Sequence, residues 1–137
     1  MVDAEVIREK LILLEEYIND LGEYRDLKLE ELTSDKITFR YLERTLHLAV
    51  EEILYIGYHI ISDERLCNPA TNKETIKILA KNDIIKENID DYIKMAQFRN
   101  IIVHDYVDID PEILLRIIHE NISDLKSIFN WYKEYIS

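Results

Sequence analysis

A short polar segment in the second half of the chain holds the residue types best suited to acid–base chemistry. Arg99 and Asn100 precede three aliphatic residues, and His104 and Tyr106 follow them. Histidine titrates near neutral pH and can take or give a proton, and arginine is always charged and forks onto phosphate oxygens. Such groups suit RNA cleavage without a metal, because one step needs a base for the ribose 2′-hydroxyl and a cation for the phosphate.

Helix geometry decides whether Arg99 and His104 can act together. Positions five apart lie about 140° from each other around a regular helix, so the two side chains would splay. We expect the helix to end near Val103, which would let both face one cleft, and a two-fold dimer would supply two of each. The spacing alone also allows a structural role, in which Arg99 pairs with Asp105 or Asp108 and His104 caps the helix.

Other polar residues are weaker candidates for a catalytic or metal site. Residues 43–59 contain a row of polar side chains at four-residue spacing, namely Glu43, His47, Glu51, Tyr55 and His59. A di-metal bundle would need Glu-x-x-His on two helices, and this pattern does not occur, so we expect a solvated or interface face and no bound metal. His119 is expected at the surface. Cys67, the only cysteine, excludes an internal disulfide and is expected to be a partly buried structural thiol.

The elements that position these residues are predicted to be helices. Apolar residues recur every three to four positions, which predicts helices over about 3–22, 35–62, 71–81, 86–103 and from 110 toward the C-terminus. Ser34 is a candidate N-cap, Thr71 and Glu74 form a capping-box pattern, and Asp110-Pro111 is a start signal. We expect 27–33 to be a loop. The predicted fold is an all-α, up-and-down bundle of four main helices plus one short helix, in a single domain over 1–137.

The helix over 35–62 carries two apolar rows. Its main row runs from Leu42 to Ile60, and a second row of Val50, Leu54 and Ile61 lies about 100° around the helix. A helix with two apolar faces is expected to be central. The second face is predicted to contact something besides the rest of the bundle, for which a homodimer partner is one candidate.

Composition narrows the class of protein. The 137 residues are 47% hydrophobic and 33% charged, with only two glycines and two prolines, which makes hairpin-rich β architectures untenable. The net charge of −11 argues against a generic nucleic-acid binder, yet residues 72–104 carry six basic and five acidic residues. The charged N-terminus and the lack of a long apolar run predict a cytoplasmic protein without a membrane segment.

The polar segment resembles a known motif. Arg99-Asn100-x-x-x-His104-x-Tyr106 is similar to the hallmark of the HEPN superfamily, and the tyrosine two residues after the histidine resembles its HepT toxin branch. The stretch from Glu43 to Glu51, with Gly57 and His59, is similar to the central helix of that branch. Phe98 and Asp108-x-Asp110 also fit. Tyr55 departs from it, since many relatives are expected to hold an acid there.

The resemblance implies an enzyme with a defined partner. It implies a homodimeric, metal-independent endoribonuclease toxin of a type VII-like pair, which cleaves tRNA or mRNA at a cleft on the two-fold axis and needs no cofactor. Arg99 and His104 would be catalytic, and Asn100 would support the phosphate. A nucleotidyltransferase antitoxin of the MNT type would transfer AMP to Tyr106 and block the site with bulk and negative charge. No DNA or membrane contact is expected.

Two other functions remain open. The bundle could be a non-catalytic binding module that partners a nucleotidyltransferase, with the motif kept for packing, or a structural helical dimer. In either case His104→Ala would reduce stability or binding and not an activity.

Overall fold

Seven helices make up the described part of the chain. The computed structural model describes residues 4–105 and 110–137, and for 98–105 it describes the backbone alone. The helices are α1 (Ala4–Gly22), α2 (Leu29–Ser34), α3 (Lys36–Asp63), α4 (Asn72–Lys81), α5 (Ile89–Asp105), α6 (Pro111–Glu120) and α7 (Ile122–Ile136). These two ranges contain no strand. The predicted all-α class is confirmed.

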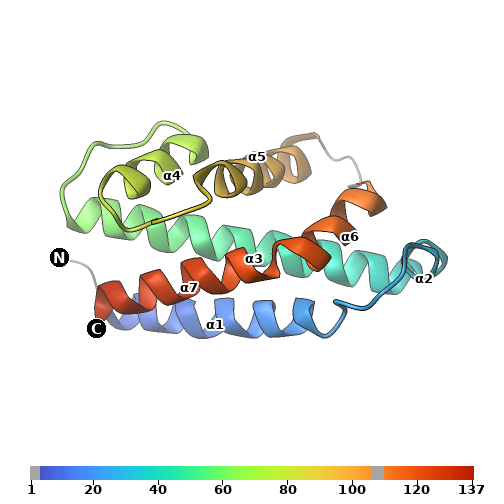
Figure 1. The fold of residues 1–137 in the computed structure, drawn as a ribbon. Helices are drawn as coiled ribbons and strands as arrows, with labels where there is room; N and C mark the ends of the chain where they lie inside the picture. Colours follow the sequence, from blue (N-terminus) through green and yellow to red (C-terminus); the bar gives the residue numbers. More distant parts are fainter. Residues whose placement is uncertain (1–3, 106–109) are drawn as a thin grey trace.

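Helix α3 is the centre of the fold. It contacts each of the other six helices, with α1 and α7 on one side and α4 and α5 on the other (Figure 1). The predicted main row of α3 is buried throughout, which confirms it as core; its members are Leu42, Leu46, Ala49, Ile53, Ile56 and Ile60. Burial of this row and of its counterparts on α1 and α7 provides the main driving force for folding.

The second apolar row of α3 is also buried within the single chain. Val50, Leu54 and Ile61 are only 1%, 8% and 2% exposed. The chain's own helices therefore cover the face that the sequence offered as a dimer contact. The expectation that this row meets something outside its own bundle is wrong.

A short helix replaces the loop predicted over 27–33. Leu32 is fully buried in α2, and Glu31 accepts a hydrogen bond from the backbone N–H of Lys28 at 3.1 Å, which holds the first turn. Ser34 closes α2, and Asp35 is the N-cap of α3. The Asp35 carboxylate accepts from the N–H groups of Ile37 and Thr38 at 3.1 and 3.2 Å. The positive end of the helix dipole also stabilises a carboxylate at this position. Asp35 therefore takes the N-cap role that was predicted for Ser34.

The predicted last helix is two helices that meet at Asn121. The start signal is confirmed, because Asp110 caps α6 by accepting from the Glu112 N–H at 2.9 Å and Pro111 follows it. Asn121 ends α6 and precedes α7, and its side chain donates to Asp124 at 2.9 Å. The apolar period continues across this break, which is why the sequence suggested one helix.

Candidate active site

The motif lies on the second half of α5. The backbone is helical from Ile89 to Asp105, so Arg99, Asn100 and His104 share one helix, and Tyr106 lies outside the described residues. The helix ends two residues beyond the predicted Val103, so the position of His104 is still helical. On a regular helix the Arg99 and His104 positions are therefore about 140° apart. One copy of α5 does not present both positions on one face.

The first half of α5 is fixed to α7 through Asp124. The hydroxyl of Tyr92 donates to the backbone carbonyl of Asp124 at 2.7 Å, and the side chain of Asn88 donates to its carboxylate at 3.0 Å. Burial, together with the charge of Asp124, raises the pKa of Tyr92, which keeps the hydroxyl protonated as a donor. The Tyr92 ring also packs edge-on against Trp131, with centroids 6.0 Å apart. These contacts set where α5 lies in the bundle.

Asp124 was not among the residues that the sequence suggested. It is only 7% exposed, and its carboxylate accepts from the side-chain amides of Asn88 and Asn121. The sequence could have pointed to it, because Asp124 is an acidic residue on the apolar face of the predicted last helix. An unpaired charge at such a position would be costly, so a buried partner is expected. We assign Asp124 a structural role, because it joins the α6–α7 corner to the start of α5.

The polar row on α3 forms a small cluster of polar and aromatic contacts around His47 and Tyr55. His47 is 7% exposed, its Nδ1 lies 3.2 Å from Nη1 of Arg44, and its Nε2 lies 3.3 Å from a carboxylate oxygen of Glu51. An arginine only donates, so Nδ1 accepts and the ring proton sits on Nε2, which faces Glu51. The predicted solvated face is therefore partly buried at His47. Tyr55 and His59 continue the row with ring centroids 4.4 Å apart.

A cavity of about 540 Å³ lies between the middle of α5 and the α6–α7 corner. Its cationic lining residues are Lys94 and Arg116, and its acidic ones are Asp91, Glu120 and Asp124. Acids outnumber bases here, so this cavity does not favour a phosphate.

The remaining candidates behave as surface groups. His119 is exposed as predicted, and its Nε2 lies 2.9 Å from the backbone carbonyl of Leu27. Cys67 is exposed, so the predicted partial burial is wrong; it lies in the irregular segment after α3. Among the side chains that the structure describes, no group of three His, Cys, Asp or Glu could hold a metal ion.

None of the described helices combines the length and apolar character needed to cross a membrane.

Sequence relatives match most of the chain. An mRNA nuclease HepT from Shewanella oneidensis is 27% identical over 89 residues, which cover 64% of this chain and 67% of the relative. A tRNA nuclease HepT from Aphanizomenon flos-aquae is 28% identical over 111 residues, covering 80% and 76%.

Solved structures share the fold. A tri-AMPylated Shewanella oneidensis HEPN toxin in complex with MNT antitoxin superposes with a TM-score of 0.83 at 22% identity, over 98% of this chain and 99% of the toxin. YutE, a cytosolic protein of unknown function from Bacillus subtilis, gives a TM-score of 0.82 at 23% identity, over 98% and 91%.

A family model described as Ribonuclease HepT-like matches residues 14–130, a range that includes the whole motif from Arg99 to Tyr106. The predicted enzyme family is confirmed: the chain belongs to the HepT-like ribonucleases.

Proposed function

We propose that this protein is the toxin of a toxin–antitoxin pair and cleaves RNA without a metal at a cleft formed by two copies of the chain. The observation that carries the proposal is the family match, since residues 14–130 include an intact Arg-Asn-x-x-x-His-x-Tyr string. Two relatives bear the names mRNA nuclease and tRNA nuclease, so cellular RNA of either kind is the proposed substrate class. The proposed location is the cytoplasm, where these RNAs occur.

The residues of the motif divide the chemistry between them. His104 would remove the proton from a ribose 2′-hydroxyl, whose oxygen then forms a bond to phosphorus while the bond to the 5′-oxygen breaks. A second protonated imidazole would supply the proton that the leaving 5′-oxygen needs. Arg99 would stabilise the charge on the phosphate oxygens, with Asn100 supporting its position.

The helical backbone favours a site built from two chains. Because Arg99 and His104 occupy positions about 140° apart on α5, a cleft that uses both is more readily made by combining Arg99 of one copy with His104 of another. A homodimer would also supply the two histidines that acid–base catalysis requires.

Tyr106 is the proposed point of control. A nucleotidyltransferase of the MNT type would transfer AMP from ATP to its phenol oxygen, with pyrophosphate leaving. The modification would place bulk and negative charge two residues from His104, where an RNA phosphate must bind. A tri-AMPylated toxin in complex with MNT antitoxin among the structures of this fold supports this choice of partner.

Expression without the antitoxin tests the function. We expect growth arrest and cleavage of tRNA or mRNA by purified protein in the presence of EDTA. His104→Ala and Arg99→Ala should each remove both effects while the circular dichroism spectrum and melting temperature stay unchanged. A wild-type protein that is harmless and leaves RNA intact would exclude the nuclease and favour the non-catalytic binding module.

A further inference from the structure

The stretch that ends α3 and forms α4 carries an excess of positive charge in a strongly acidic chain. Residues 65–82 contain four basic residues and one acidic residue, a net charge of +3, whereas the whole chain has a net charge of −11. The four cations are Arg65, Lys73, Lys77 and Lys81, and all are exposed. At about 0.15 M ionic strength the Debye length is about 8 Å, so a ligand at this surface responds to these charges more than to acids across the bundle.

Three of these cations form a row on α4. Lys73, Lys77 and Lys81 are four residues apart, so they lie on one face of the helix, about 6 Å from each other along its axis at 1.5 Å per residue. None of the three forms an ion pair with a residue that the structure describes. This α4 lysine row is therefore suited to a ligand that carries several negative charges in line.

A pocket of about 470 Å³ opens beside the row, between α4 and the segment that follows α3. Its lining combines the cations of Lys77 and Lys81 with the amide side chains of Asn68 and Asn82. The acid that lines it, Glu74, is already engaged, because its carboxylate accepts a hydrogen bond of 2.6 Å from the backbone N–H four residues earlier. The volume lies within the range of about 300–1,000 Å³ that is typical of ligand sites.

The wall after α3 is fixed by the way in which that helix ends. The N–H of Leu66 donates to the carbonyl of Ile61 at 3.0 Å, and the N–H of Arg65 donates to that of Ser62 at 3.2 Å, which together form a Schellman motif. Arg65 has a φ of 54°, in the left-handed region where glycine is usual at this position. An arginine here has a conformational cost that glycine would avoid, which supports a use for its charge. The turn leads the chain toward α4, where the next residues line the pocket.

The end of α4 is compensated against its own dipole. The last carbonyls of a helix carry partial negative charge, which would repel an anion. The carbonyl of Ile78 accepts from both the backbone N–H and the side-chain amide of Asn82, at 3.2 and 2.8 Å, and that of Leu79 accepts from the Ile84 N–H at 2.9 Å. Lys81 adds a positive charge in the last turn. The pocket therefore keeps its positive balance.

The pocket also offers the groups that would recognise a nucleobase. Asn82 donates to a carbonyl of its own helix, so its amide oxygen is left to accept. The oxygen of Asn68 accepts from the Tyr58 hydroxyl at 3.4 Å, which leaves its amide hydrogens to donate. Leu66 and Ile78 supply an apolar wall for the face of a base. Unpaired nucleotides expose both their edges and their faces, whereas bases within a duplex are stacked and paired.

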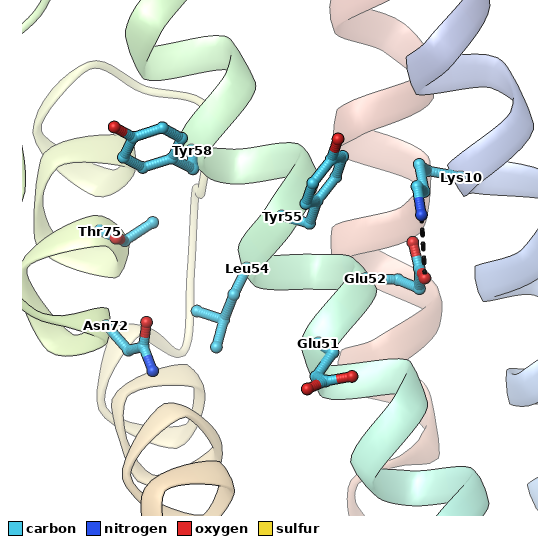
Figure 2. Close-up of a pocket in the computed structure, with 8 residues that line it drawn as sticks. All are labelled: Lys10, Glu51, Glu52, Leu54, Tyr55, Tyr58, Asn72 and Thr75. Carbon is cyan, nitrogen blue, oxygen red and sulfur yellow. Dashed lines mark ion pairs between the residues drawn. The ribbon is translucent and has the colours of Figure 1, made fainter.

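A second pocket near α4 lacks this balance. It has a volume of about 420 Å³ and lies between α1, α3 and α4. Figure 2 shows its cation, Lys10, paired with Glu52 at 3.6 Å, and Glu51 on the same helix as Glu52. The positive charge is neutralised there and a further acid lines the pocket, so it does not favour a phosphate.

We propose that the pocket beside the α4 lysine row binds an unpaired nucleotide of the RNA substrate, with Lys73, Lys77 and Lys81 contacting successive phosphates. The proposal deepens the proposed function and rests on it for the identity of the ligand. Helices α4 and α5 pack together on the same side of α3, and α5 leads from α4 toward α6 with the motif on its second half (Figure 1). An RNA as large as tRNA can contact the row and the motif at once. The subsite would therefore hold substrate away from the reacting phosphate.

Exchange of two lysines for glutamine tests the row. In a His104→Ala background, which stops cleavage, Lys77→Gln/Lys81→Gln should weaken the binding of tRNA as measured by fluorescence anisotropy. Each phosphate contact of a single strand contributes about 0.7 to the slope of log K against log salt, so the slope should fall by about 1.4 and the affinity by about tenfold at about 0.15 M salt. Both positions are exposed and glutamine favours helix, so the melting temperature should not change.

The matched control removes two cations from another pocket. Arg8→Gln/Lys133→Gln neutralises two exposed residues between α1 and α7, across α3 from α4 (Figure 1). The net charge changes by the same amount, but the affinity for tRNA should stay within about twofold, because no phosphate contact is lost. Equal losses in the two double variants would show that RNA responds to net charge alone and would overturn the proposal.

Cys67 reports on the pocket itself. It lines the pocket, is exposed and is the only cysteine of the chain. At ten times its dissociation constant, tRNA should slow the reaction of this thiol with N-ethylmaleimide about tenfold by mass action. ATP at the same concentration should not slow it, and the Lys77→Gln/Lys81→Gln variant should lose most of the protection by tRNA. Protection by ATP alone, or by the purified antitoxin and not by tRNA, would rule out RNA as the ligand.

Kinetics separate failure of the subsite from failure of the proposed function. With the subsite in place, Lys77→Gln/Lys81→Gln should raise KM for tRNA about tenfold and leave kcat unchanged, which is the pattern for lost binding away from the reacting atoms. A chain that cleaves tRNA with the same KM in this variant would refute the subsite and leave the nuclease intact. A chain that binds tRNA through the row but cleaves no RNA would refute the nuclease and leave the subsite.

Discussion

The hydroxyl of Tyr132 on α7 donates a hydrogen bond of 2.9 Å to the backbone carbonyl of Ile53 in the middle of α3. The ring is fully buried, and burial raises the pKa of the phenol, so the group remains a neutral donor over the working pH range. This contact fixes the depth at which α7 packs on the central helix.

Removing that hydroxyl should reduce stability without altering the packing of the ring. We expect Tyr132→Phe to lower the free energy of unfolding by about 1 kcal/mol, the usual net value of one buried hydrogen bond. Urea denaturation would measure the loss. Tyr58→Phe removes a hydroxyl whose contact with Asn68 is exposed and 3.4 Å long, and it should have no measurable effect. Equal losses in the two variants would contradict this assignment.

The two glycines should respond in opposite ways to alanine. A Cβ at Gly57 would lie 2.7 Å from Cδ1 of Leu79 and 2.9 Å from the hydroxyl of Tyr132, so these two side chains or α3 itself would have to shift. We expect Gly57→Ala to destabilise the protein by about 1–3 kcal/mol, the range for overpacked cores. At Gly22, the last residue of α1, an added Cβ would meet no other side chain within 4 Å, which makes Gly22→Ala the matched control. Its stability should stay equal or rise, since alanine favours helix.

Glu52 should make the stability of the fold depend on pH. Its side chain is 12% exposed and pairs with Lys10 at 3.6 Å, yet burial raises its pKa more than Lys10 lowers it. The folded state therefore binds the proton more tightly than the unfolded chain does, and the charged form costs stability at neutral pH. That cost disappears as the pH falls through the raised pKa.

Glu52→Gln should consequently increase the free energy of unfolding at pH 7.5. The increase should shrink as the pH is lowered and the Glu52 carboxylate of the wild-type protein takes up its proton. Urea denaturation over a series of pH values below 7.5 measures both effects. Lys10→Met provides the opposite case, because it leaves the buried carboxylate without its cation and should destabilise most at the higher pH. A gain for Glu52→Gln that does not change with pH would refute the titration of Glu52 as its source.

Co-expression with the nucleotidyltransferase from the same locus tests the proposed control at Tyr106. We expect the intact mass of the protein to increase by one or more adenylyl groups and the nuclease activity to fall. Tyr106→Phe should show no such increase and should remain toxic beside the antitoxin. His104→Ala is the matched control, since it should be modified normally although it is inactive. Adenylylation that persists in Tyr106→Phe would place the modification on another residue.

The sequence by itself determined the helical class, the main core and the identity of the motif. The three-to-four-residue spacing from Leu42 to Ile60 predicts a helix, because only a helix brings these side chains to one face. Local cap chemistry likewise fixed the start of α6 at Asp110-Pro111. These features depend only on residues that are close together in the sequence, so the sequence is sufficient to predict them.

Tertiary structure decided what depends on distant neighbours. Val50, Leu54 and Ile61 resembled a dimer face, but they are buried once α4 and α5 pack on α3. Asp124 anchors α5 through partners 32 and 36 residues away, a separation that no local pattern encodes. On the remaining face of α3, Ile37 and three tyrosines stay exposed. Which apolar face stays exposed is a property of the packed bundle, since it depends on which elements compete to cover it.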